Sequence, residues 1–146
     1  MNFEWRVIAE NLVYLLWGRS DQGEIGGLAL TVLIALSAGL LALGGGVVLA
    51  GLAWRWPGRL RKLIIAWAEL IRGIPLIFVI FWLYFLLPRW LGRDVPGALT
   101  VSAALAWFSS AAVMHSTLAA LEALPRGQCE AALACGFRKG QILVWI

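Results

Sequence analysis

The sequence predicts an all-α membrane protein with three transmembrane helices, an N-terminal helix at the membrane interface and a cytoplasmic segment after the last span. Of its 146 residues, 62% are hydrophobic and 14% are charged, whereas soluble domains are about 45–50% apolar and about 25% charged. A soluble domain of this length has too little interior to bury so much apolar surface. The apolar residues also gather in three long stretches, each long enough to cross a bilayer.

Composition and motifs exclude several other classes of protein. Disordered chains are poor in aliphatic and aromatic residues. The net charge of +4 is spread between apolar tracts and forms no stripe that could follow phosphates. The sequence contains no nucleophile–base pair, carboxylate pair or metal cluster, since Cys129 and Cys135 stand six apart without an accompanying histidine. We therefore predict no enzymatic activity, no cofactor, no metal and no nucleic-acid partner.

Residues 1–24 predict a helix in the outer membrane interface, followed by a turn. Glu4 and Glu10 interrupt the apolar stretch, which excludes a secretory signal. The polar, glycine-bearing residues 18–23 indicate the turn into the first span. The apolar face of the predicted helix contains Trp5, Ile8, Leu12, Leu15 and Leu16, and the opposite face contains Glu4, Arg6, Glu10 and Asn11.

The three predicted spans cover residues 25–54, 63–88 and 97–121. The first contains no charged side chain, and at 1.5 Å per residue it forms a helix of about 45 Å, longer than the hydrocarbon core of about 30 Å. The second is interrupted only by Glu69 and Arg72. Hydropathy therefore predicts three crossings.

Basic residues predict the orientation of these spans. With the N-terminus outside, seven Lys and Arg lie on the cytoplasmic side and four on the far side, leaving out Arg72 within its span. The positive-inside rule then favours an external N-terminus and a cytoplasmic C-terminus. Most of the difference comes from the loop at residues 55–62.

Polar residues inside the spans are costly and therefore informative. A charged group there costs at least about 2.5–3.5 kcal/mol on insertion scales. Glu69 and Arg72 share a helical face at positions i and i+3, so we predict a structural ion pair near the cytoplasmic interface. Pro75 lacks an amide hydrogen and predicts a kink or break. His115 has no carboxylate in its own span, which favours a hydrogen-bonded packing role over proton relay.

Small residues within the spans predict close helix contacts. Gly44–Gly46 lies in mid-membrane and is not followed by Gly-Lys-Ser/Thr, so helix packing is favoured over a phosphate loop. Three helices alone leave small faces such as Gly39, Gly44–Gly46 and Ala103–Ala104 without enough partners. We therefore expect a second subunit.

The segment after the third span resembles the Glu-Ala-Ala loop of permease subunits in ATP-binding-cassette (ABC) importers. Glu130-Ala131-Ala132, Gly136 and Ile146 keep the spacing of that motif. Its usual lead-in of Pro-x-Gly-Gln is present at Pro125, Gly127 and Gln128.

An upstream motif resembles the polar amino-acid uptake branch of the same family, which includes permeases for histidine, glutamate and glutamine. Glu69-x-x-Arg72-Gly73-Ile74-Pro75-Leu76 matches the Glu-x-x-Arg-Gly/Ser-x-Pro-Leu signature of that branch. Gly27-x-x-x-Thr31 is similar to the opening of its first span.

The resemblance implies a subunit of an importer in the bacterial inner membrane, with a periplasmic N-terminus. Its partners would be a cytoplasmic ATPase, a second permease subunit in a homo- or heterodimer, a periplasmic amino-acid-binding protein and membrane lipid. Residues 122–146 would form the cytoplasmic coupling segment, with a short helix that has Glu130 near its start and a turn at Gly136. The residues implied in ATPase coupling are Gly127, Glu130, Ala131, Ala132, Gly136 and Phe137. Those implied in the motif beside the pathway are Glu69, Arg72, Gly73 and Pro75.

The sequence also departs from the family pattern. Family members carry about two further spans, so residues 1–146 are expected to be a single partial permease domain that lacks the C-terminal third. A Ser-Glu-x-x-Arg-x-Gly pattern near the end of the third span is replaced at His115, Leu118 and Ala120, so no substrate-binding residue is assigned. The leading hypothesis is a permease subunit for polar amino acids. The alternative is a truncated, non-transporting membrane protein that retains the ATPase-docking loop.

Overall fold

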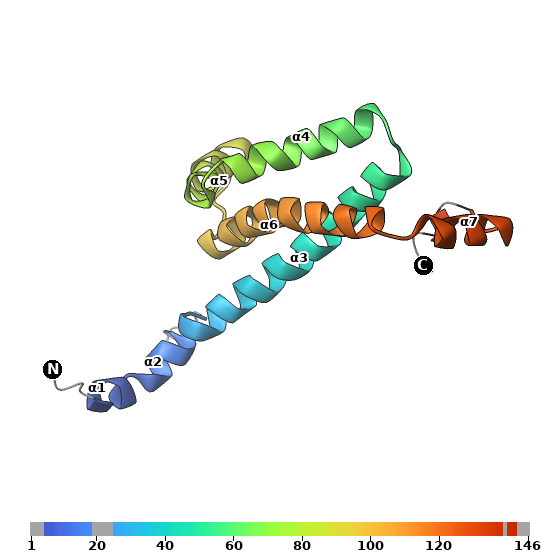
Figure 1. Ribbon diagram of the computed structural model, residues 1–146. Coiled ribbons are helices and arrows are strands. Elements are labelled where there is room, and N and C mark those ends of the chain that lie inside the picture. The colour runs from blue at the N-terminus through green and yellow to red at the C-terminus, as the bar shows by residue number, and fades with distance from the viewer. Residues whose placement is uncertain (1–4, 19–24, 139, 143–146) are drawn as a thin grey trace.

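The computed structural model describes residues 5–18, 25–138 and 140–142, and the described chain is helical without strands (Figure 1). The fold class is therefore confirmed as all-α. The helices are α1 (Trp5–Glu10), α2 (Leu12–Trp17), α3 (Gly27–Arg55), α4 (Arg59–Gly73), α5 (Leu76–Leu91), α6 (Gly97–Glu122) and α7 (Arg126–Ala134).

Two helices are long and apolar enough to cross a membrane, namely α3 and α6. They match the first and third predicted spans closely. The second predicted span, residues 63–88, is not one straight helix, because α4 and α5 meet at an angle of 99°. This pair counts as a third span only if both halves belong to one crossing, so the number of crossings stays a prediction.

The bend between α4 and α5 occurs at the predicted break. Ile74 is extended, with φ −98° and ψ 130°, and Pro75 precedes the first residue of α5. Proline cannot donate an amide hydrogen bond and forces its preceding residue away from the helical region. Local sequence therefore explains the position of the break.

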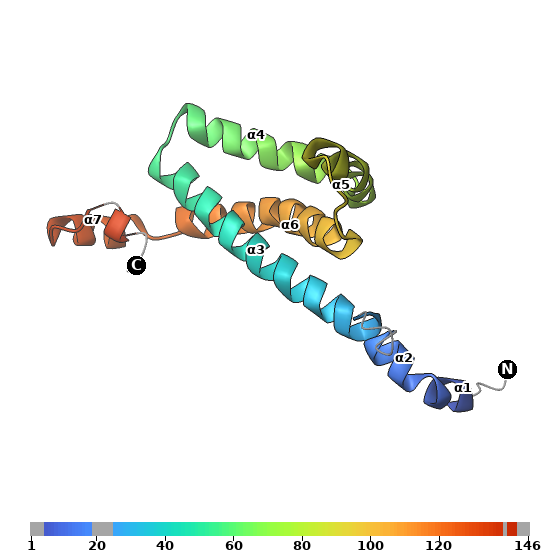
Figure 2. The ribbon, with the colours of Figure 1, turned by 180° about the vertical axis from the view of Figure 1, so that it is seen from behind.

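The helix pair α3 and α6 forms the centre of the fold, and α6 crosses α3 in both side views (Figure 1, Figure 2). On α3, small buried residues recur every fourth position at Ala38, Ala42, Gly46 and Ala50, which places them on one helical face. Small residues let two backbones approach, the usual basis of helix association in membranes. A core cluster continues from this crossing onto α4 and contains Ala50, Ala53, Ile64, Ala68, Ala111, Met114 and Leu118.

Among the glycines of α3, Gly46 lies closest to α6. A Cβ added there would lie 2.5 Å from Val113 Cβ and 2.9 Å from the Ser110 carbonyl oxygen. At Gly44 and Gly39 an added Cβ would meet nothing within 4 Å. The predicted close packing is thus confirmed at Gly46. Gly46 and Ala104 are buried within the chain, whereas Gly39 and Gly44 have open space beside them; the expected second subunit stays a prediction.

The N-terminal region consists of two short helices that divide at Asn11. Polar residues are confined to α1 and Asn11, because α2 reads Leu-Val-Tyr-Leu-Leu-Trp and is apolar on every side. The structure therefore divides the predicted single helix into two, and the place of this region at the interface stays a prediction. The α2 helix packs against α3, where a Cβ on Gly27 would overlap the Leu15 carbonyl oxygen. The turn at residues 19–24 and the first four residues lie outside the described chain.

Candidate functional site

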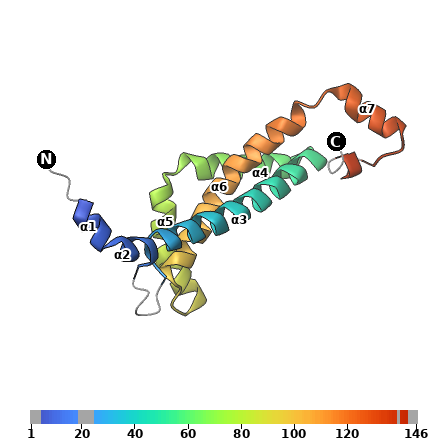
Figure 3. The same cartoon turned by 90° about the horizontal axis from the view of Figure 1, so that it is seen from below.

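The predicted coupling segment, residues 122–146, contains a short helix, α7, that extends away from the helix bundle (Figure 1, Figure 3). It begins after Pro125, whose φ of −57° and lack of an amide hydrogen suit a helix start. Leu133 and Phe137 are exposed, with 46% and 39% of their surfaces accessible, whereas Ala132 is buried. The segment therefore presents large apolar side chains beyond the end of α6.

The C-terminal end of α7 is closed by Gly136. This glycine has φ +84°, and its amide donates to the Leu133 carbonyl at 3.0 Å. The Phe137 amide donates to the Ala132 carbonyl, also at 3.0 Å. These two bonds define a Schellman motif, in which glycine supplies the left-handed residue after a helix. The predicted turn at Gly136 is confirmed.

The beginning of α7 differs from the prediction. Glu130 was expected near the first turn, where a carboxylate would favour the positive end of the helix dipole. The helix begins at Arg126 and has no acidic residue in its first turn, so Glu130 lies in the second turn and that argument fails. Glu130 and Ala131 are exposed.

A second helical turn, residues 140–142, follows α7. The Arg138 amide donates to the Gln141 side-chain oxygen at 2.8 Å, and Ile142 is 2% exposed. A glutamine that caps the amide three residues earlier fixes the start of such a turn. The motif residue Ile146 lies outside the described chain.

The upstream motif residue Glu69 contacts α6 instead of its neighbour on α4. Its Oε1 lies 3.4 Å from His115 Nε2, and no ion pair joins Glu69 to Arg72 among the described residues, so the predicted pair is wrong. Arg72 is exposed near the end of α4. His115 Nε2 is buried without a hydrogen bond, which also contradicts its predicted hydrogen-bonded role.

A second contact between α4 and α6 joins Arg61 to Glu122. The guanidinium and carboxylate lie 2.5 Å apart, and both side chains are partly exposed. Glu122 is the last residue of α6, shortly before α7 begins. This pair therefore ties the first turn of α4 to the last turn of α6, just before α7.

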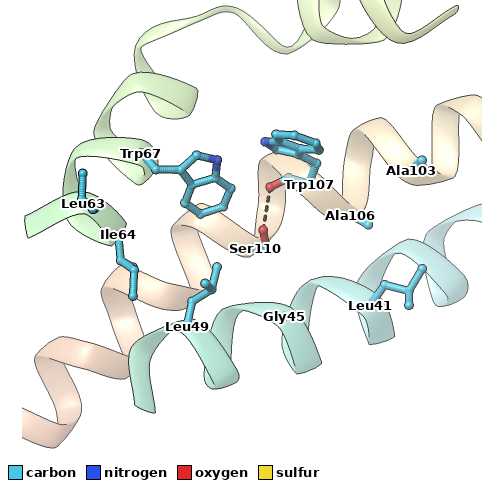
Figure 4. A pocket seen from close by; sticks show the side chains of 10 residues that line it. All are labelled: Leu41, Gly45, Leu49, Leu63, Ile64, Trp67, Ala103, Ala106, Trp107 and Ser110. Atoms are coloured by element: carbon cyan, nitrogen blue, oxygen red, sulfur yellow. Dashed lines mark hydrogen bonds between the residues drawn. The ribbon is translucent and has the colours of Figure 1, made fainter. Parts of the chain in front are cut away.

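A groove of about 610 Å³ lies between α3, α4 and α6 (Figure 4). Trp67 and Trp107 lie next to each other in its lining, with ring centroids 6.3 Å apart. The Ser110 hydroxyl donates to the Trp107 carbonyl at 2.7 Å and is thereby occupied. The remaining lining residues are aliphatic or glycine, which suits an apolar neighbour better than a polar solute.

Residues 42–146 match the family described as "Binding-protein-dependent transport system inner membrane component". The chain belongs to this family.

Curated relatives of this permease are amino-acid transporters. The inner membrane amino-acid ABC transporter permease protein YhdY of Escherichia coli K12 is 37% identical over 96% of the chain and 41% of YhdY. The glutamate/aspartate import permease protein GltK of Escherichia coli O157:H7 is 27% identical over 95% of the chain and 61% of GltK. The probable glutamine ABC transporter permease protein GlnM of Bacillus subtilis is 35% identical over 56% of the chain and 37% of GlnM. No solved structure matches.

These matches confirm the resemblance to the polar amino-acid ABC permeases. The permease is a multi-pass inner-membrane protein of a transporter family, and this family is not a family of enzymes. The chain spans about two fifths of YhdY and about three fifths of GltK. The sequence motifs therefore identified the family. The contacts of Glu69 with His115 and of Arg61 with Glu122 could not be predicted from the sequence, because each joins residues far apart in the chain.

Proposed function

We propose that this permease forms part of the translocation pathway for polar amino acids in an ABC importer, driven by ATP hydrolysis in a separate cytoplasmic ATPase. Relatives are named for the transport of amino acids, of glutamate and aspartate, and of glutamine, which supports the substrate class. A periplasmic binding protein would deliver the amino acid to the membrane subunits.

The observation that carries the proposal is that α7 extends away from the other helices and ends in a glycine turn at Gly136. No helix of the described bundle packs extensively against it, so its exposed residues are available to another protein. The proposed coupling residues Gly127, Glu130, Ala131, Ala132, Gly136 and Phe137 all lie in α7 or in the turn that ends it. Docking of the ATPase at α7 would let motion pass through the short link to α6.

The bent pair α4–α5 is the proposed pathway element, with the motif Glu69, Arg72, Gly73 and Pro75 beside the break. Irregular backbone at membrane depth is tolerated where it is packed in protein or lines a cavity. Exposed apolar side chains on α3 and α5, such as Leu40 and Phe85, suit membrane lipid and a second permease subunit. The permease would therefore work as one half of a homo- or heterodimer.

Transport itself provides the direct test. Proteoliposomes that contain the permease, a second permease subunit, the ATPase and the binding protein should take up glutamate, aspartate or glutamine only with ATP. The permease without a second subunit should give no uptake, because its large exposed apolar faces would lack a partner. ATPase binding without uptake of any polar amino acid would instead favour the alternative, a non-transporting protein that retains the docking loop.

We also propose an external N-terminus with residues 55–62 and 122–146 in the cytoplasm, from the distribution of Lys and Arg. In a variant with Cys129 and Cys135 replaced by Ser, a cysteine at Pro57 should resist an impermeant thiol reagent added to intact cells. A cysteine at Asp94, in the exposed loop between α5 and α6, should be labelled. Labelling at position 57 would contradict the orientation, and protection at position 94 would contradict a crossing by α4 and α5.

A further inference from the structure

The turn between α3 and α4 carries an unbalanced positive charge. Four of the twelve Lys and Arg in the sequence lie within residues 55–62, and no acidic residue lies among them. One of the four, Arg61, is balanced by the carboxylate of Glu122. The other three form no ion pair among the described residues and are called the basic cluster: Arg55, Arg59 and Lys62. All three are exposed, so the cluster is open to a ligand of negative charge.

The groove between α3, α4 and α6 begins next to the basic cluster. Leu63 and Ile64 lie at one end of the groove, and Leu41 lies at the other (Figure 4). Leu63 directly follows Lys62 in α4. One end of the groove is therefore adjacent to the cations in the first turn of α4, and the rest of it runs away from them along α3 and α6.

Helix geometry places Arg59 on the groove side of α4. Residues four apart lie on the same face of a helix, and Arg59, Leu63 and Trp67 follow one another at this spacing. Leu63 and Trp67 both line the groove. A cation therefore stands at the end of the apolar wall that α4 contributes.

The lining of the groove determines which part of a ligand can enter it. The Ser110 hydroxyl is occupied by the Trp107 carbonyl, and the rest of the lining is apolar, including the rings of Trp67 and Trp107. A polar group buried there without a partner would be costly, whereas a hydrocarbon chain has no hydrogen bonds to lose. A ligand that suits both the groove and the basic cluster has a long apolar part and a negatively charged head.

We propose that the groove binds an anionic phospholipid, with its phosphate at Arg59 and Lys62 and one acyl chain along the groove. Phosphate oxygens accept charge-assisted hydrogen bonds from arginine and lysine, and basic pockets between transmembrane helices bind anionic head groups. A zwitterionic lipid carries no net charge to balance the basic cluster, so the site selects phosphatidylglycerol over phosphatidylcholine. This inference concerns lipid and does not depend on ATPase docking or on transport.

Native mass spectrometry of the purified permease tests this selection. The permease in detergent is mixed with equal amounts of phosphatidylglycerol and phosphatidylcholine that carry the same acyl chains. The first lipid bound should be phosphatidylglycerol about tenfold more often, because each cation near the head group favours an anionic lipid. Arg59→Gln with Lys62→Gln should bring the two lipids to within about twofold of each other. Arg89→Gln with Arg93→Gln removes two exposed cations at the far end of α5, and this matched control should keep the preference.

A second pair of variants tests whether the acyl chain occupies the groove. Gly45 lines the groove, and a Cβ added there would lie 3.7 Å from Ser110 Cβ, an ordinary contact distance. Gly45→Leu should therefore fill part of the groove and lower the binding of phosphatidylglycerol about fivefold, since less of the acyl chain is buried. Gly44→Leu adds the same side chain where a Cβ meets nothing within 4 Å, and it should bind phosphatidylglycerol as the wild type does.

Three results would overturn the proposal. The first is equal binding of the two lipids by the wild type, and the second is a preference that survives the loss of Arg59 and Lys62. The third is unchanged binding of phosphatidylglycerol by Gly45→Leu, which would contradict an acyl chain in the groove. A dimer that binds no phosphatidylglycerol would also overturn it, because a second copy of the chain would then cover the groove.

Discussion

Replacing Gly136 with valine should reduce recovery of the ATPase with the permease about tenfold or more. Gly136 has φ +84°, a conformation that costs a non-glycine residue about 1–3 kcal/mol and a β-branched residue the most. The strain would open the two amide–carbonyl bonds that end α7 and move Phe137 relative to the helix. The measurement is co-purification of the ATPase with wild-type and Gly136→Val permeases, at matched levels of membrane insertion.

Gly140→Val is the matched control for this experiment. Gly140 lies four residues further along, an added Cβ there would meet nothing within 4 Å, and its φ is not positive. The control should recover the ATPase about as well as the wild type. Ala131→Trp, on the exposed surface of α7, should weaken recovery by obstructing the surface without straining the backbone. Equal recovery with all of these variants would remove the proposed docking role of α7.

Local chemistry explains why this end of the coupling segment could be predicted from the sequence. Glycine after an alanine-rich stretch favours a left-handed helix end whatever the rest of the fold does. The same holds for the break at Pro75, because the missing amide hydrogen acts on its own turn. Long apolar stretches likewise predict α3 and α6 from composition alone.

The sequence could not predict features that depend on how distant segments meet. Spacing along α4 suggested that Glu69 would pair with Arg72, but the approach of α6 brings His115 to the carboxylate instead. The angle of 99° between α4 and α5 also exceeds what a proline alone determines, since proline fixes where a helix breaks and packing sets the direction afterwards. Gly44 and Gly46 look equivalent in sequence, and only the crossing of α6 distinguishes them.

That crossing predicts the second large effect, which is loss of stability in Gly46→Ala. The new Cβ would lie 2.5 Å from Val113 Cβ and 2.6 Å from its Cγ1, closer than carbon atoms can approach. Either α3 and α6 must separate or Val113 must move, and overpacking of this kind costs typically about 1–3 kcal/mol. Gly46→Leu should cost more, because its larger side chain enters the same contact. The measurement is the free energy of unfolding in mixed micelles with increasing dodecyl sulfate.

Gly44→Ala controls for the helical propensity of alanine. An added Cβ at Gly44 would meet nothing within 4 Å, so this variant should be unchanged or stabilised by up to about 1 kcal/mol, the propensity difference between alanine and glycine. Val113→Ala should relieve only part of the loss in Gly46→Ala. It removes the Cγ1 contact, while the Cβ of residue 113 at 2.5 Å, which alanine keeps, and the Ser110 carbonyl at 2.9 Å leave the rest. If Gly46→Ala and Gly44→Ala unfold at the same concentration of dodecyl sulfate, then the helices do not cross at Gly46. The small-residue face of α3 would then have to pack against a different partner.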